Sequence, residues 1–260
     1  MEKVIGIAGY GRVGGSMAMA LSRRGWKIHI LTRFPDDAPF HFYPRERAEQ
    51  FLKKARNFII AVRDSDIRNM AHLFSRLDVT GKRFLHLSGA LPSRELEPIR
   101  ERGGFIGSFH PLQTFPRRDP SLLQNIYFSF EGDQEARALA STLAQEFGSR
   151  LFDINPDKKT LYHAAAVFAS NFADAMWIIA DMLMKEVSDE GFRVMEPLVR
   201  TTLENALLMG PEEALTGPAR RRDTITIEKH LKELEKHPHL ERIYRAITEF
   251  ILQYFEEDRL

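Results

Sequence analysis

The sequence predicts an α/β fold, in which a mostly parallel sheet forms an N-terminal domain and a smaller all-α domain follows it. Over residues 4–153, short apolar runs alternate with amphipathic segments, as in parallel sheets whose strands are joined by helices. A glycine-rich turn follows the first of these runs. Beyond them the apolar residues recur every three or four positions, as on helices, and no convincing strand follows. We therefore expect two domains, residues 1–154 and 155–260.

Composition narrows the class of protein. Hydrophobic residues make up 43% and charged residues 28% of the chain, which is typical of soluble globular proteins. The formal net charge of +1 gives no reason to expect nucleic acid or a membrane surface as a partner. No run reaches the ~18 consecutive apolar residues of a membrane span, and the first predicted strand begins too early for a signal peptide. Without cysteine the chain has no thiolate chemistry, and its histidines lack metal-ligand spacing. We expect a cytoplasmic protein without a bound metal.

The strongest motif lies in residues 4–21, VIGIAGYGRVGGSMAMAL. An apolar run predicts a buried strand, the G-x-G-x-x-G spacing of Gly9, Gly11 and Gly14 follows, and a helix is predicted after it. Gly9 allows the tight turn, Gly11 lets a pyrophosphate approach the backbone, and Gly14 lets the helix pack closely on the strand. The helix N-terminus offers N–H groups and a positive dipole end to phosphates. The motif indicates a Rossmann-like dinucleotide-binding domain. A tight glycine turn without a ligand is the alternative.

The end of the second predicted strand, Lys27–Leu31, indicates which dinucleotide is bound. Folds that select NAD place an acidic residue there to hold the ribose 2′-hydroxyl, whereas this chain has Thr32 and Arg33. A hydroxyl and a guanidinium suit a 2′-phosphate, so the sequence predicts NADPH over NADH. The alternative for Arg33 is a plain surface arginine. Arg12 could add a phosphate contact or be solvated, and the remaining loop residues expected at the cofactor are Tyr10 and Val13.

The rest of the N-terminal domain is expected to continue the alternation of strands and helices. An irregular excursion is expected over 36–43, marked by prolines at 35, 38 and 44. Strands are predicted over 57–62, 83–87, 105–109, 126–130 and 150–153. Helices are predicted over 46–55 and 134–147, and another is predicted to begin within residues 63–66. Because ligands bind at the carboxyl ends of parallel strands, the turns after two of these strands should border the cofactor. These turns contribute Val62, Arg63, Ser88 and Gly89.

The second domain is expected to be helical. Asn155, Pro156 and Asp157 predict a helix start, with an N-cap, a proline at the first helical position and an acid in the first turn. Apolar residues at 161, 165, 168, 172, 176, 179 and 183 predict one continuous helix of about seven turns with a buried stripe. Further helices are predicted over 197–209, 227–236 and 242–255.

Two polar stretches are candidates for catalysis. The segment HPLQTFP, residues 110–116, leaves a predicted strand at the ligand-binding edge, and is either a substrate loop with His110 and Gln113 or a proline-rich crossover. In YHAAAVFASN, residues 162–171, His163 and Ser170 lie seven residues apart, which is about two turns along one helix face. Asn171 lies on the flank of that face. This pattern favours a polar groove with a small floor, against a close helix–helix contact that contains a satisfied histidine.

A third polar stretch is LTGPARRRD, residues 215–223, between two predicted helices. Thr216 and the arginines, of which we select Arg221, could hold an anionic group, and Asp223 could orient an arginine. A solvated basic loop is the alternative.

Five motifs together resemble a known family. They are the glycine loop 9–14, HLSGAL at 86–91, GSFHPLQTF at 107–115, YHAAAVFASN at 162–171 and LTGPARRRD at 215–223. The chain resembles a family of NADP-dependent oxidoreductases that have a Rossmann-like domain and a C-terminal helical domain of unknown function. That family is similar to the wider 6-phosphogluconate-dehydrogenase-like group. The group includes ketopantoate reductase, pyrroline-5-carboxylate reductase, prephenate dehydrogenase and deazaflavin-dependent NADP reductases.

The resemblance implies a reaction and roles for residues. In the hydroxyacid dehydrogenases and ketopantoate reductase, the first long helix of the second domain bears a catalytic lysine with asparagines one or two turns later. His163 falls at the lysine position and Asn171 at a downstream asparagine, whereas Lys158 and Lys159 lie too early on the helix. The resemblance implies hydride transfer from NADPH, in the cleft between the domains, to a small carbonyl or imine acid. Among 2-oxo acids the leading substrate is 2-oxopantoate.

The proton for this reaction is expected from a histidine, because reduction of a carbonyl leaves negative charge on its oxygen. We expect His163 to be the general acid, with His110 as its rival and Asn171 as a third catalytic residue. The substrate is expected to bind Gln113, Ser170, Thr216 and Arg221.

The sequence also leaves other functions open and bears on the oligomeric state. A non-catalytic NADP(H)-binding sensor or partner protein is the main alternative. A Rossmann methyltransferase is disfavoured, because the residue after the second strand is basic. The helical domain is expected to form a homodimer, since its apolar stripe is more than three short helices cover and isologous pairing is the commonest symmetry.

Overall fold

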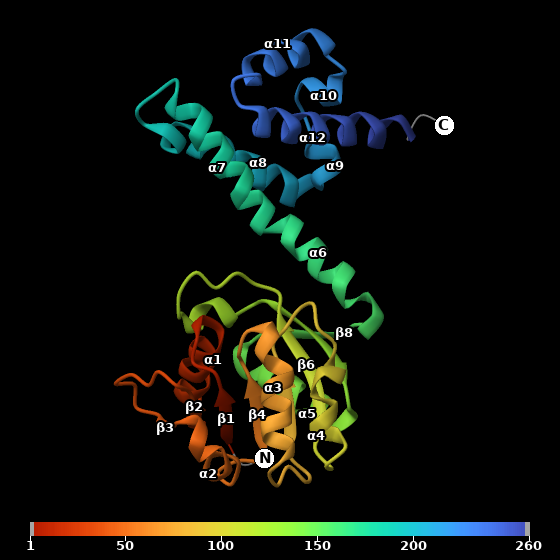
Figure 1. Ribbon diagram of the computed structural model, residues 1–260. Coiled ribbons are helices and arrows are strands. Elements are labelled where there is room, and N and C mark those ends of the chain that lie inside the picture. The colour runs from red at the N-terminus through yellow and green to blue at the C-terminus, as the bar shows by residue number, and fades with distance from the viewer. Residues whose placement is uncertain (1–2, 258–260) are drawn as a thin grey trace. The chain divides into compact units, whose positions relative to one another are not determined.

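The computed structural model describes residues 3–257, and the apolar runs of its first half form one eight-stranded sheet (Figure 1). The strand order is β3-β2-β1-β4-β5-β6-β7-β8. Neighbouring strands pair in parallel, except that β6 and β7 are antiparallel. This confirms the predicted fold class. The strands are β1 Val4–Ala8, β2 Lys27–Leu31, β3 His41–Tyr43, β4 Asn57–Ile60, β5 Arg83–His86, β6 Phe105–Pro111, β7 Tyr127–Gly132 and β8 Arg150–Asp153.

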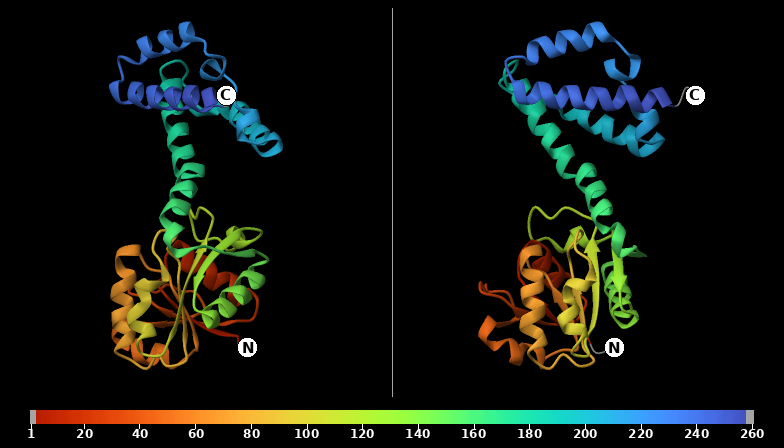
Figure 2. Two further views of the ribbon diagram at one scale, coloured as in Figure 1. Left: turned by 90° about the vertical axis from the view of Figure 1, so that its right-hand side faces the viewer. Right: turned by 45° about the vertical axis from the view of Figure 1, so that its right-hand side comes forward.

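Helices cover both faces of this sheet (Figure 2). Side chains alternate between the two faces of a strand, so Ile5 and Ile7 of β1 contact one hydrophobic cluster and Ala8 contacts the other. The first cluster includes residues of α1 and α5, and the second includes residues of α2, α3 and α4. The helical segments are α1 Arg12–Arg23, η1 Arg45–Arg47, α2 Ala48–Leu52, α3 Asp64–Ser75, η2 Ser93–Leu96, α4 Glu97–Arg100, η3 Pro120–Leu123 and α5 Gln134–Phe147.

The excursion predicted to be irregular contains a strand, which corrects that expectation. His41–Tyr43 forms β3 and extends the sheet by pairing in parallel with β2. Neighbouring aromatic rings stabilise this edge, because Phe40 and Phe42 both contact the ring of Tyr10 with centroids 6.0 and 5.4 Å away. The sequence pattern missed it because three prolines surround only three paired residues.

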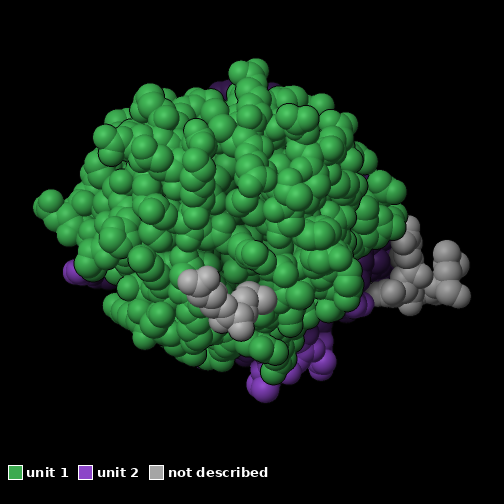
Figure 3. Space-filling view, turned by 90° about the horizontal axis from the view of Figure 1, so that it is seen from below, with its two compact units in different colours: residues 1–171 green, residues 172–260 purple. Residues whose placement is uncertain are grey.

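Contacts divide the chain into two compact units, Met1–Asn171 and Phe172–Leu260 (Figure 3). The last strand, β8, ends at Asp153, close to the domain boundary expected from the sequence. The first unit nevertheless includes the following helix α6, Lys159–Ala169. Side chains of α6 contact the sheet strands, as the site described below shows.

The long helix predicted after residue 155 is not continuous, which corrects a second expectation. It begins as predicted, since the Asn155 side chain accepts a hydrogen bond from the N–H of Asp157 at 2.9 Å and caps the turn η4, Pro156–Lys158. The helical conformation then breaks at Ser170, where φ is −129° and ψ is −76°. Its hydroxyl donates to the carbonyl of Ala166 at 2.7 Å, a bond that bends helices. The helix α7, Asn171–Lys185, follows the break.

The apolar stripe of α6 and α7 is not buried in the described chain, which corrects a third expectation. No residue of α7 is buried, and Leu161 of α6 is 67% exposed. By length and composition, residues 156–185 are the one helical stretch among the described residues that could cross a membrane, with a mean hydropathy of 1.3. A single such helix is weak support for a membrane span. The stripe therefore identifies apolar surface that the described residues leave uncovered.

The second unit is helical throughout its described residues. Its pattern of apolar residues predicted three of its helices, each within a few residues of the observed bounds. Two short helices, α9 Pro211–Ala214 and α10 Pro218–Arg221, lie where the sequence pattern predicts no helix. After α7 the helical segments are η5 Gly191–Met195, α8 Glu196–Met209, α9 Pro211–Ala214, α10 Pro218–Arg221, α11 Thr224–Leu234 and α12 Pro238–Glu257.

A buried histidine makes the fold sensitive to acid. His29 of β2 is 3% exposed, stacks on His41 and bonds the Tyr43 hydroxyl through Nδ1 at 3.1 Å. Burial, and then the charge of His41, lower the pKa of His29 from 6.5 to about 4. The unfolded chain therefore binds more protons below pH ~6.5, and stability falls as the pH drops from there.

Between pH 8 and pH 5 the native protein should lose about 2 kcal/mol of stability because His29 is protonated in the unfolded chain but not in the folded one. In His29→Gln we expect this part of the loss to disappear, because glutamine does not titrate. Urea unfolding at both pH values measures this. The matched control is His72→Gln, which changes an exposed histidine. An identical pH dependence in native protein and His29→Gln would contradict the prediction.

Candidate functional site

The glycine loop between β1 and α1 has the geometry that the motif predicts. Gly9 has a φ of +104°, and a side chain there would collide with the carbonyl of Ala61. A Cβ on Gly14 would collide with the carbonyl of Gly9 and lie 2.9 Å from the Ala61 Cβ. Gly11 differs from both, because nothing lies within 4 Å of a Cβ placed there. Two glycines are therefore required by the fold, and the third leaves open space at the start of α1.

A cavity of about 380 Å³ opens beside this loop. The loop after β2 and the loop after β4 form its other walls, at the carboxyl ends of neighbouring strands. Seven residues of the expected cofactor set line it, namely Gly9, Tyr10, Gly11, Thr32, Arg33, Val62 and Arg63. Arg45 also lines this cavity and was not expected from the sequence, because it lies beyond the proline-rich excursion. None of the described carboxylates forms an ion pair with Arg33, Arg45 or Arg63, so three guanidinium groups at the cavity are available to an anion.

The other five expected cofactor residues lie outside this cavity. Arg12 is exposed at the first position of α1, Val13 packs against the core, and Gly14 lies within α1. Within the glycine loop, the carbonyl of Tyr10 accepts a hydrogen bond from the Arg118 guanidinium at 2.8 Å. The remaining two, Ser88 and Gly89, follow β5 and belong to a second group of residues.

The second group brings two histidines against Gly89. A Cβ on Gly89 would lie 2.7 Å from Cδ2 of His163 and 2.8 Å from Nε2 of His110. The two imidazole centroids are 6.0 Å apart and nearly perpendicular. His110 comes from β6, His163 from α6 and Gly89 from the loop after β5, so the first unit alone assembles these residues. The sequence predicted both histidines but not that they meet at one glycine.

The surroundings of His110 keep its ring neutral. Its Nδ1 lies 2.8 Å from the hydroxyl of Tyr162. Burial, and then the charges of Lys159 and His163, lower the pKa of His110 from 6.5 to about 3. Burial also raises the pKa of Tyr162, so its hydroxyl is protonated at neutral pH and can donate to Nδ1. In that arrangement His110 presents Nε2–H on the side of Gly89.

Lys159 is a residue of this group that the sequence reasoning set aside. Its position near the helix start did not match the lysine of the resembling enzymes, yet it is buried at 1% exposure. Its ammonium donates to Ser108 Oγ at 2.7 Å and to the carbonyl of Ser88 at 3.3 Å. Burial lowers its pKa to about 8, so it is mostly charged at neutral pH. The one feature of the sequence that could have indicated Lys159 is its position one helical turn before His163.

Three of the expected catalytic and substrate-binding residues make their hydrogen bonds with residues other than the two histidines. The Gln113 side chain accepts a hydrogen bond from the N–H of Thr114 at 2.8 Å and is exposed. The hydroxyl of Ser170 bonds within the helix break and lies 3.2 Å from Oδ1 of Asn171. Asn171 is exposed at the first position of α7.

The basic loop of the second unit is partly structural. Arg220 lies over the ring of Phe255 at 3.8 Å, and Arg222 pairs with Glu256 at 2.9 Å. These two contacts join α10 to α12. Asp223 accepts hydrogen bonds from the N–H and hydroxyl of Thr226 and caps α11, so it does not orient an arginine as expected. Thr216 and Arg221 are exposed.

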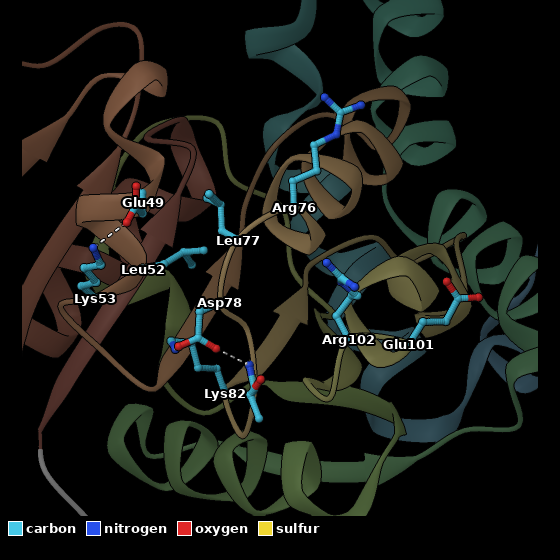
Figure 4. Close-up of a pocket in the computed structure, with 10 residues that line it drawn as sticks. Glu49, Leu52, Lys53, Arg76, Leu77, Asp78, Lys82, Glu101 and Arg102 are labelled. Atoms are coloured by element: carbon cyan, nitrogen blue, oxygen red, sulfur yellow. Dashed lines mark hydrogen bonds and ion pairs between the residues drawn. The ribbon is translucent and has the colours of Figure 1, made fainter.

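The largest cavity described, about 750 Å³, lies at the opposite edge of the sheet (Figure 4). It borders the amino ends of β5 and β6, where ligands of parallel sheets do not bind. Its charged side chains largely neutralise one another. Lys53 pairs with Glu49, and Lys82 pairs with Asp78, as the dashed lines in Figure 4 mark. Among the described residues, no group of three or more potential metal ligands was found.

Comparison with known proteins identifies similar chains. The model of a domain of unknown function, DUF2520, matches residues 126–251. The chain is similar to a candidate NADP oxidoreductase from Bacteroides fragilis, with a TM-score of 0.77, 26% identity and coverage of 96% of this chain and 98% of that one. It is also similar to a Thermotoga maritima protein whose name states no activity, with a TM-score of 0.73, 27% identity and coverage of 98% and 100%. No curated protein matches the sequence.

More distant structures share the fold. Pyrroline carboxylate reductase from Plasmodium falciparum, solved with NADP bound, has a TM-score of 0.64 at 12% identity, with 98% of this chain and 97% of that chain covered. Together these comparisons confirm the predicted resemblance to Rossmann-fold NADP oxidoreductases with a helical C-terminal domain.

Proposed function

We propose that this chain is a cytoplasmic NADPH-dependent oxidoreductase that reduces a small carbonyl acid, such as the 2-oxo acid 2-oxopantoate, or an imine acid by hydride transfer. The whole-length similarity to a candidate NADP oxidoreductase supports the cofactor and the class of reaction. The pyrroline carboxylate reductase, and an imine reductase from Pseudomonas that shares the fold with a TM-score of 0.64 at 18% identity, support reduction of a C=N bond.

The observation that carries the proposal is that both groups of residues lie at the carboxyl edge of one sheet. The glycine loop follows β1, the arginine-lined cavity extends to β2 and β4, and the two histidines meet at the loop after the next strand, β5. A dinucleotide bound along this edge extends from the glycine loop across the neighbouring strands. The proposal therefore accounts for the cavity and for the histidines with one ligand.

The residues of the cavity fit NADP(H). The open space at Gly11 admits a pyrophosphate beside the N-terminus of α1, and the guanidinium groups of Arg33 and Arg45 suit a 2′-phosphate. When bound, the nicotinamide supplies the hydride. The chain itself must hold the substrate and deliver a proton to the developing negative charge. We assign the proton to His163, because the neutral ring of His110 is suited to donating a hydrogen bond from Nε2 rather than a proton.

The remaining predicted residues have supporting roles in this proposal. Within the second unit, Thr216 and Arg221 are the groups that would bind an anion such as a carboxylate, since Arg220 and Arg222 are already engaged with α12. Within the first unit, Gln113, Ser170 and Asn171 would bind polar groups of the substrate.

Oxidation of NADPH by a panel of 2-oxo acids and cyclic imines tests the function. Turnover of at least one acid that depends on His163 is the expected result. Tight NADPH binding with no turnover anywhere in the panel would contradict the proposal and favour a non-catalytic NADP(H) sensor.

Arg33 should select NADPH over NADH. A guanidinium forms charge-assisted bonds to a 2′-phosphate worth roughly 1.5–3 kcal/mol each, which exposure to solvent reduces. We therefore expect Arg33→Ala to weaken NADPH about 10-fold or more and to leave NADH nearly unchanged. Arg45→Ala should act in the same direction. Dissociation constants from titration of cofactor fluorescence measure both.

The control for these arginines is Arg23→Ala, at the exposed far end of α1, which should change neither constant. Equal affinity of the native protein for NADH and NADPH would exclude a 2′-phosphate site.

We also propose that the second unit forms a homodimer. Large apolar side chains remain exposed on α7 and α8, including Ile178 at 61% and Leu208 at 83%. Soluble monomers rarely leave large apolar patches exposed, and a second copy would cover such side chains symmetrically. We expect a dimer at micromolar concentration in sedimentation equilibrium, and a shift towards monomer in Ile178→Glu.

The control for the dimer is Glu204→Gln, which changes an exposed polar position of α8. A monomeric mass for the native chain would contradict the prediction.

A further inference from the structure

Lys159 is a buried cation whose burial neither the predicted site nor the proposed proton transfer explains. Lysine is almost never fully buried unless it is paired. Here no carboxylate of the described residues forms an ion pair with the ammonium, and its two acceptors, Ser108 Oγ and the Ser88 carbonyl, are neutral. Both acceptors are also joined to each other, because Ser108 Oγ donates to the Ser88 carbonyl at 3.2 Å.

These two acceptors connect Lys159 to the histidines. The carbonyl of Ser88 belongs to the peptide bond that leads into Gly89, the glycine against which both imidazole rings lie. Ser108 is two residues before His110 on β6, so their side chains point to the same face of the sheet. The ammonium therefore joins the loop after β5 to the strand that carries His110.

The charged groups around Lys159 come from four other elements. Glu131 of β7 and Asp64 of α3 raise its pKa, against the larger effect of burial. Both carboxylates have neutral partners, since Glu131 accepts from the N–H and hydroxyl of Ser93 and Asp64 accepts from the hydroxyl of Ser88. His86 of β5 and His110 of β6 are the titratable groups on which the charge of Lys159 acts.

The positive charge of Lys159 acts on both of these histidines. After burial, the charge of Lys159 is the next largest cause that lowers the pKa of His86 and the pKa of His110. Among the described residues, the charge of His163 also lowers the pKa of His110. His86 accepts a hydrogen bond at Nδ1 from the N–H of Ser88, as a neutral ring does.

We propose that Lys159 is a positioning residue of this site, whose ammonium holds the Gly89 loop against β6 and adds to the effect of burial in disfavouring protonation of His110 beside His163. The two histidines then have different roles, because the neutral ring of His110 is suited to donating a hydrogen bond from Nε2 rather than a proton. The difference between the catalytic roles of the two histidines rests on the proposed function. The protonation state of His110 is independent of the proposed function, because it is measured without any substrate.

Titration of the histidine ring protons by NMR tests the proposal, with His110 assigned by comparison with His110→Gln. In Lys159→Met the apolar stem is retained and the charge is lost. We expect the titration midpoint of His110 to rise by about one to two pH units, the effect of a unit charge at roughly 6–10 Å in a protein environment. Lys158→Met is the matched control, because it removes the charge of the exposed neighbouring lysine and should leave the midpoint unchanged.

Two further variants separate the charge from the hydrogen bonds. Ser108→Ala removes one acceptor of the ammonium but keeps the charge, so His110 should titrate as in the native protein. Lys159→Arg retains a cation and should restore the native midpoint. A folded Lys159→Met protein in which His110 titrates as in the native chain would overturn the proposal.

A measurement on the native chain avoids any dependence on the folding of a variant. With lysine labelled at Cε, the Lys159 amine should titrate near pH 8, and the His110 ring signals should shift over the same range. Ring signals that do not respond while the amine loses its proton would also overturn the proposal. If the proposed function alone is wrong, these titrations are unaffected and only turnover is absent.

Discussion

His163→Gln should lower turnover by about 10²–10⁴-fold, which is the range for loss of one acid–base group. NADPH affinity should stay within a factor of about three. Reduction of a carbonyl places negative charge on its oxygen, and glutamine at this position cannot supply a proton. The ring of His163 lies against Gly89 at the carboxyl edge of the sheet, outside the cavity that the cofactor loop borders. The measurement is the steady-state rate for the best substrate of the panel, with cofactor affinity determined separately.

His110→Gln is the comparison that distinguishes the two histidines. Since its ring is neutral and bonded to Tyr162, its loss should raise KM or lower turnover less than the loss of His163. Tyr162→Phe should have the same, smaller effect, because it removes the partner of His110 Nδ1. Near-native turnover in His163→Gln together with a large loss in His110→Gln would reverse the assignment.

Gly11→Val should reduce NADPH affinity by roughly 100-fold and leave stability nearly unchanged. The backbone at Gly11 is extended, with φ −77° and ψ −159°, and nothing lies within 4 Å of an added Cβ, so the fold tolerates a side chain there. The added side chain occupies the space that a pyrophosphate requires and removes hydrogen bonds to its charged oxygens, worth roughly 1.5–3 kcal/mol each. Calorimetric binding and thermal unfolding measure the two effects independently.

Gly14→Ala is the opposite case and serves as the control for Gly11→Val. Its Cβ would collide with the Gly9 carbonyl, so we expect a loss of stability that appears without any cofactor. If Gly11→Val bound NADPH normally in a folded protein, the glycine loop would not be a pyrophosphate site.

The sequence by itself determined the fold class and the edge of the sheet at which the glycine loop lies. Strand periodicity and the glycine spacing are local properties, so the pattern predicted α5 with its observed bounds and β1, β2, β4 and β5 within a few residues. The three glycines could be assigned distinct roles in advance because each depends on backbone geometry within one turn. Both histidines could be selected for a similar reason, since polar residues at strand ends and along one helix face are visible in the sequence.

Only the tertiary structure decided which of these residues meet and in what electrostatic state. Arg45 lines the same cavity as Arg33. β3 extends the sheet by pairing with β2, and its proline-rich surroundings give no strand pattern in the sequence. The position of Lys159 near the start of its helix does not by itself predict a role in the site. Its 1% exposure arises from contacts with Ser88 and Ser108, which lie 71 and 51 residues away in the chain. Burial and the charge of a distant residue set the protonation of His110, and neither can be derived from local sequence, because both depend on which segments the fold brings together.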